Sequence, residues 1–100
     1  MASDKEYVEY VIEQLSCVPA LTVKPMFGEY GLYCDGVLFG YVCDNRMLFK
    51  KTSSNEKYGM GTDYPYEGAK EMYVPDNLQD KEELAKIVSD TVSYLAKKKK

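Results

Sequence analysis

The fold is decided by the stretch MFGEYGLYCDGVLFGYVCDNRMLFKK, residues 26–51 of the chain. Asp35-Gly36 separates two runs of aromatic and β-favouring residues, and a type I′ hairpin turn favours such a pair because both of its central positions need positive φ. Asp44-Asn45 offers a second turn of this kind, and Gly28-Glu29 a third. The stretch therefore predicts an antiparallel meander.

Amphipathic helices are predicted on both sides of this meander. Ser3 and Glu6 have the spacing of a capping box, and Asp80 and Glu83 repeat that spacing near the other end of the chain. Apolar residues follow each signal at helical intervals: Val8, Val11, Ile12 and Leu15 in the first helix, and Leu84, Ile87, Val88, Val92 and Leu95 in the second. Each stripe predicts a helix with one face buried in the core.

Two shorter segments complete the predicted sheet. Leu21–Lys24 leads into Pro25, and Lys70–Val74 is closed by Pro75, so that both read as strands at or near an edge. The expected fold is α+β, with an antiparallel meander of four to five strands flanked by N- and C-terminal amphipathic helices. At 100 residues the chain is expected to form a single domain, residues 1–100.

Composition excludes several classes of protein. The chain has 45% hydrophobic and 29% charged residues and a formal charge of −3, which argues against a domain-wide affinity for phosphate backbones. No apolar run approaches the roughly 20 residues that span a bilayer, and the first residues are polar. The three cysteines include no CxxC pair and predict neither disulfides nor a zinc site. Together these features lead us to expect a cytoplasmic protein without membrane contact.

Catalysis is not expected. The chain contains no histidine, which removes the commonest general base and most zinc sites. The acidic residues cluster on the predicted helices, where solvated faces explain them better than a catalytic carboxylate pair. We therefore predict no catalytic residues, no metal and no cofactor.

The meander is apolar on both of its faces, which is the most informative feature of the sequence. Straight pairing across the two turns places one set of residues on a common face: Gly31, Tyr33, Leu38, Gly40, Val42, Met47 and Phe49. Two helices cover only one face, so this second face must meet a loop, another subunit or a ligand. Gly31 and Gly40 are expected to lie opposite each other, in a dip bordered by Tyr33, Met47 and Phe49.

Two interpretations of this dip remain open: an interface or pocket, or glycines that relieve crowding under a packed loop. The predicted interface or pocket residues are Gly31, Tyr33, Gly40, Val42, Met47 and Phe49. The polar, Gly-rich segment 52–69 carries Tyr58, Met60, Tyr64 and Tyr66. Because apolar groups on so long a loop favour packing, we expect this segment to cover part of the second face.

The motif residues of the meander resemble the signature of the TfoX N-terminal domain family. They are Met26, Phe27, Gly28, Tyr30, Gly31, Leu32 and Tyr33, followed by Asp35-Gly36, Phe39-Gly40, Asp44, Leu48 and Lys50. The resemblance implies an α+β fold and a link to regulators of competence for DNA uptake in bacteria. In those regulators a helical domain follows, and we expect its contribution to be missing from these 100 residues.

The leading hypothesis is a small regulatory module that acts through protein contacts, with self-association through the second sheet face. The alternative is a nucleic-acid-binding module using Arg46, Lys50, Lys51 and the C-terminal lysines, Lys97 to Lys100. Pro25 and Glu29 stand where the family often has a basic residue and a glycine, which makes direct nucleic-acid contact less favoured. A third hypothesis is a small ligand bound over Gly31 and Gly40.

Overall fold

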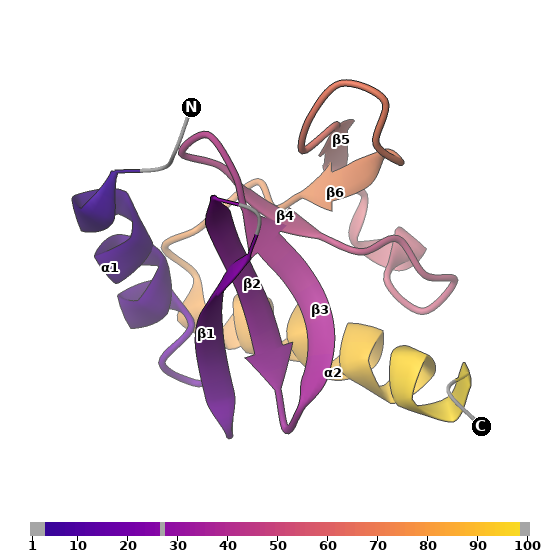
Figure 1. Ribbon diagram of the computed structural model, residues 1–100. Helices are drawn as coiled ribbons and strands as arrows, with labels where there is room; N and C mark the ends of the chain where they lie inside the picture. The colour runs from indigo at the N-terminus through magenta and orange to yellow at the C-terminus, as the bar shows by residue number, and fades with distance from the viewer. Residues whose placement is uncertain (1–3, 27, 99–100) are drawn as a thin grey trace.

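Nine helices and strands are found in the computed structural model, which describes residues 4–26 and 28–98 (Figure 1). In chain order they are α1 (Lys5–Gln14), β1 (Leu21–Met26), β2 (Glu29–Cys34), β3 (Val37–Val42), β4 (Met47–Phe49), the 3-10 helix η1 (Glu56–Tyr58), β5 (Gly61–Asp63), β6 (Met72–Val74) and α2 (Lys81–Lys98). None of the helices in these described ranges is long and apolar enough to cross a membrane.

The strands described form one antiparallel sheet of six, in the order β1-β2-β3-β4-β6-β5. The predicted α+β class is thus confirmed, with one strand more than expected. The additional strand is β5, which pairs with β6 at the far edge, Thr62 opposite Tyr73. The segment predicted as the last strand becomes β6, beside β4 through Phe49 and Tyr73.

The two predicted turns of the meander are confirmed by their backbone angles. Asp35 and Gly36 have φ of 51° and 80°, and Asp44 and Asn45 have φ of 53° and 57°, as type I′ turns require. The third turn is displaced by one residue from the expected Gly28-Glu29. Met26 pairs with Glu29, so this turn consists of residues 27 and 28, of which Phe27 lies outside the described residues.

The register between β2 and β3 differs from straight pairing. Cys34 lies opposite Val37 and Tyr33 opposite Leu38, as the first turn predicts, but Leu32 then lies opposite Gly40. Phe39 is the extra residue of a β-bulge. Side chains alternate between the two faces along a strand, so one extra residue reverses the faces of all residues after it. The later residues of β3, and the residues of β4 that pair with them, therefore lie on the face opposite to the one that straight pairing predicts.

The core lies between the sheet and the two helices, whose buried residues join the same cluster. Figure 1 shows α2 behind the sheet and α1 beside β1. Its largest members include Phe39, Phe49, Met47, Leu15 and Leu84. We call the sheet face toward the helices the inner face and the opposite one the outer face.

The helix predictions hold with one exception on α1. Val8, Val11 and Leu15 are buried, but Ile12 is 41% exposed. Gln14 is buried instead and donates a hydrogen bond of 2.5 Å to the carbonyl of Leu78.

The helix-start signals have different outcomes at the two ends of the chain. Asp80 caps α2 as predicted, accepting a 3.0 Å bond from the N–H of Glu83. Ser3 of the predicted capping box lies outside the described residues, and Asp4 stands at the N-cap of α1 without a side-chain cap bond.

The first half of segment 52–69 is fastened to α2 by buried polar groups. The Asn55 side chain, 0% exposed, donates to Lys50 O at 2.8 Å and to Thr91 Oγ1 at 2.9 Å. Tyr58 adds a 2.6 Å bond to the Asp90 carboxylate. This carboxylate is the main reason that the pKa of Tyr58 rises to about 12. This half of the segment therefore belongs to the helical side of the molecule.

Gly40 is required by the bulge. A Cβ at this position would overlap the carbonyl oxygen of Leu48, whereas a Cβ on Gly61 would meet open space. Overpacking costs about 1–3 kcal/mol, and more where a backbone atom cannot move. We predict that Gly40→Ala lowers the free energy of unfolding by at least this amount in urea titrations, while Gly61→Ala changes it by less than about 0.5 kcal/mol. Equal losses in the two variants would contradict the observed register.

Candidate interaction surface

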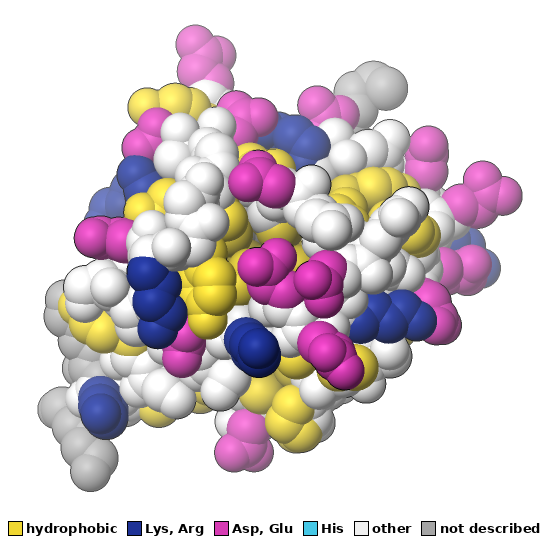
Figure 2. Space-filling view, turned by 180° about the vertical axis from the view of Figure 1, so that it is seen from behind, with side chains coloured by type: hydrophobic (Ala, Val, Ile, Leu, Met, Phe, Trp, Pro, Cys, Tyr) yellow, Lys and Arg dark blue, Asp and Glu magenta, His cyan; other side chains and the backbone are white. Residues whose placement is uncertain are grey.

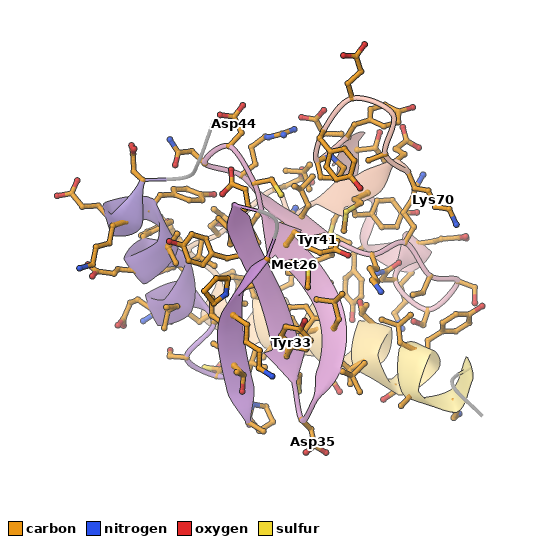
Figure 3. All side chains as sticks on the ribbon, in the orientation of Figure 1. Met26, Tyr33, Asp35, Tyr41, Asp44 and Lys70 are labelled. Atoms are coloured by element: carbon orange, nitrogen blue, oxygen red, sulfur yellow. The ribbon has the colours of Figure 1, made fainter. Side chains whose placement is uncertain are left out.

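The outer face of the sheet carries an apolar surface on the side away from the main core. Tyr41 packs there against a small buried cluster of Cys43, Leu48 and Met72, which is separate from the main core. Farther along the same face, the side chains of Met26, Tyr33 and Leu38 converge over Gly31, each within 3.1–3.2 Å of where its Cβ would stand. Figure 3 shows Met26, Tyr33 and Tyr41 on this side of the sheet.

Two open hollows lie on the outer face. The first has a volume of about 700 Å³ and is lined by Met26, Glu29, Tyr41, Cys43, Asp44, Arg46, Pro65 and Tyr66. The second, of about 540 Å³, is lined by residues that include Lys50, Lys51, Lys70, Glu71 and Met72, and it extends to Leu95 of α2. Both hollows share a wall formed by Tyr41, Pro65 and Tyr66. We call this wall the aromatic ridge.

Arg46 fixes the ridge in place. Its Nη1 forms an ion pair of 2.6 Å with Asp63 and donates to the carbonyl of Tyr64 at 2.9 Å. Its Nη2 donates to Pro65 O at 3.2 Å, and its Nε donates to Cys43 O at 3.3 Å. The pKa of the Asp63 carboxyl is lowered from its ordinary value by the hydrogen bond that it accepts from the Tyr64 N–H, and also by its contact with the Arg46 guanidinium. One guanidinium thus ties segment 63–65 to the second turn.

The second half of segment 52–69 therefore covers part of the outer face, as expected from its apolar residues. Pro65 is buried against this face, whereas the neighbouring Tyr64 and Tyr66 are 52% and 68% exposed. Large exposed tyrosines beside a hollow present apolar area together with a polar end, which suits a contact surface.

Burial keeps two titratable groups of the hollows, Cys43 and Tyr41, in their neutral forms. Burial raises the pKa of the Cys43 thiol, and Glu29 adds to the effect, so that the thiol is a weak nucleophile at neutral pH. Burial likewise raises the pKa of Tyr41, with Tyr66 contributing. Both groups remain neutral and present a largely apolar surface.

Two of the cations proposed for nucleic-acid contact are engaged by carboxylates. Arg46 is engaged by Asp63, and Lys51 forms a 2.5 Å ion pair with Glu71 while lying 5.1 Å from the Tyr73 ring centre. Lys97 stands far along α2, and the side chains of Lys98 to Lys100 lie outside the described residues. On the helical face shown in Figure 2, Asp and Glu side chains are interspersed with single Lys and Arg side chains.

The predicted interface or pocket residues are divided between the two faces. Val42, Met47 and Phe49 are 0–1% exposed in the core, on the inner face. Gly40 pairs with Leu32 and Phe49 and does not face Gly31, whose partner on β3 is Tyr41. Only Gly31 and Tyr33 lie on the outer face. The expected common surface was wrong because the bulge at Phe39 reverses the faces beyond it.

The motif residues are divided in the same way. Met26, Gly31 and Tyr33 belong to the outer face, whereas Tyr30 and Leu32 belong to the core. Gly28 occupies a turn with φ of 81°, which only glycine adopts readily, and Phe27 lies outside the described residues. The motif therefore shapes the sheet more than it lines a single site.

Sequence reasoning missed the aromatic ridge and its fastening. Tyr64-Pro65-Tyr66 is a visible signal, because two aromatic residues flanking a proline in a polar loop favour an ordered contact. Nothing in the sequence connects Arg46 to Asp63, and the position of Tyr41 depends on the bulge.

Comparison with known proteins decides the family. The model of the TfoX N-terminal domain matches residues 13–94, a range that contains every strand of the sheet. The chain belongs to the TfoX N-terminal domain family. A relative of this TfoX N-terminal domain is an uncharacterized 12.7 kDa protein in the trpE 5′ region of Spirochaeta aurantia, 38% identical over 80 residues, which are 78% of this chain and 70% of the relative.

Loss of the Arg46 contacts is predicted to uncover Cys43. In a Cys17→Ser background, which removes the exposed thiol, Arg46→Met should raise the labelling rate of Cys43 by roughly tenfold or more, because charge-assisted hydrogen bonds close this site. Labelling of each cysteine is followed by peptide mass spectrometry. Cys34 is an internal control, because it is buried on the inner face.

Lys57→Met, which breaks the ion pair with Asp90 on the helical side, serves as the matched variant. It should leave Cys43 labelling unchanged. Equal acceleration at Cys34 and Cys43 in the Arg46→Met protein would indicate general unfolding and would refute a local role for Arg46.

Proposed function

We propose that this TfoX N-terminal domain is a small regulatory module that acts by protein contact, and that its outer sheet face binds a second copy of the chain. One observation carries the proposal: the outer face combines two open hollows with Tyr66, which is 68% exposed on the ridge between them. An open apolar hollow next to an exposed aromatic residue is a common arrangement at protein interfaces.

The regulatory part of the proposal rests on family membership. A TfoX N-terminal domain suggests a role in regulation, and the competence link implied by the motif residues is the specific form of it that we propose. Binding without catalysis is supported by the absence of histidine from the sequence and by the raised pKa values of Tyr41 and Cys43, which keep both groups neutral. The free cysteines, usual in a reducing compartment, support a cytoplasmic setting.

Direct nucleic-acid binding is less well supported. Arg46 and Lys51 already form ion pairs with Asp63 and Glu71, and opening these pairs would reduce the gain from a phosphate contact. The formal charge of −3 adds long-range repulsion.

Sedimentation equilibrium tests the proposal. The unmodified chain should dimerise at micromolar concentration, and Tyr66→Asp should weaken the dimer at least roughly tenfold because it places a charge on the contact surface. Tyr10→Asp is the matched control, since Tyr10 is also exposed, at 39%, but lies on α1. A chain that stays monomeric at every concentration, or equal effects of the two variants, would overturn the proposal.

A further inference from the structure

We propose that the two copies pair across their outer faces about a two-fold axis, with the acidic end of the first hollow of each copy against the basic end of the second hollow of the other. This inference rests on the proposed function and assigns its geometry. It follows from how charge is distributed around the two hollows.

The first hollow ends in acidic groups. Asp44 is exposed at the second turn, and Glu29 lies beside it, where its carboxylate accepts a 2.7 Å bond from the N–H of Asp44. The cation in this hollow, Arg46, is neutralised by Asp63. The end of the first hollow near the turn therefore presents the exposed Asp44 carboxylate.

The second hollow ends in basic groups. Lys50, Lys51 and Lys70 line it together with one carboxylate, that of Glu71, which is paired to Lys51. Within residues 4–26 and 28–98, neither the Lys70 ammonium nor the Asp44 carboxylate forms an ion pair. Two exposed charges of opposite sign thus stand at the two ends of the groove that the two adjoining hollows form together.

The aromatic ridge separates these ends. Tyr41, Pro65 and Tyr66 border both hollows, and Figure 3 shows Tyr41 between Asp44 and Lys70 across the outer face. The order along the groove is therefore acidic, aromatic, basic. Such a surface is complementary to itself when it is turned by 180°.

A two-fold interface uses this property twice. In an isologous interface every contact occurs twice, once from each copy. If Asp44 faces the partner's Lys70, then Lys70 also faces the partner's Asp44. The ridges then meet near the axis. Tyr66 is exposed enough to enter the partner's hollow, whose volume of about 540 or 700 Å³ admits an aromatic side chain.

Charge reversal tests the arrangement. Lys70→Glu and Asp44→Lys should each weaken the dimer roughly tenfold, because each variant places like charges together at two symmetric positions. An equimolar mixture of the two variants should restore dimerisation to near the unmodified level. In that heterodimer the glutamate of one chain meets the lysine of the other, and the unchanged Asp44 meets the unchanged Lys70.

The mixture also controls for folding. Asp44 has φ of 53°, which a lysine adopts less readily than an aspartate, but a misfolded Asp44→Lys chain cannot rescue its partner. Lys86→Glu, which reverses an exposed charge on α2, should leave the dimer unchanged. Sedimentation of labelled and unlabelled variants at a fixed total concentration measures each association.

The outcomes separate this inference from the proposed function. If Tyr66→Asp dissociates the dimer while neither charge reversal alters it, or if the mixture is as weak as the single variants, the two-fold charge arrangement is wrong and outer-face self-association stands. If the unmodified chain does not associate, the proposed function fails and this inference fails with it. Recovery of the dimer in the mixture alone supports the arrangement.

Discussion

The extra residue at Phe39 is the constraint on which the rest of the structure depends. It turns Val42, Met47 and Phe49 toward the helices, on the side that Phe39 already faces, and moves Tyr41, Cys43 and Leu48 to the other side. Without the bulge, straight alternation would divide the aromatic side chains differently, and Tyr41 would compete with Phe39 for space beneath α2. Gly40 permits the arrangement because the Leu48 backbone occupies the place that a side chain would take.

This division makes the two sheet faces unequal. The inner face is closed by both helices, and the buried Asn55–Thr91 hydrogen bond fastens the following loop to α2. The outer face is shaped chiefly by Arg46, which holds Pro65 over Cys43 and leaves open space on both sides of the ridge. A rigid surface formed in this way needs little ordering on association, which favours its use as an interface.

Sequence signals that act between neighbouring residues predicted the turns and helices well. Contacts between residues far apart in the chain were predicted poorly. Asp35-Gly36 and Asp44-Asn45 set their turns through positive φ, and Asp80 caps α2, because these effects act within a few residues.

The bulge was not predictable, since neither Phe39 nor Gly40 requires one in isolation; the choice arises from packing against α2 and Leu48. β5 was missed because Gly61-Thr62-Asp63 carries no strand signal and pairs only once β6 is in place. Arg46 was interpreted as a phosphate contact because its partner Asp63 is seventeen residues away.

The bulge separates a closed inner face from an open outer face. Nuclear Overhauser effects in isotopically labelled protein test this separation. The bulged register predicts cross-peaks from the Phe39 ring to methyl groups of Leu84, Ile87 or Val88, and from the Tyr41 ring to Leu48 and Met72. Cross-peaks from the rings of both Phe39 and Tyr41 to the methyl groups of Ile87 or Val88, with none from Tyr41 to Leu48 or Met72, would show straight alternation and contradict this separation.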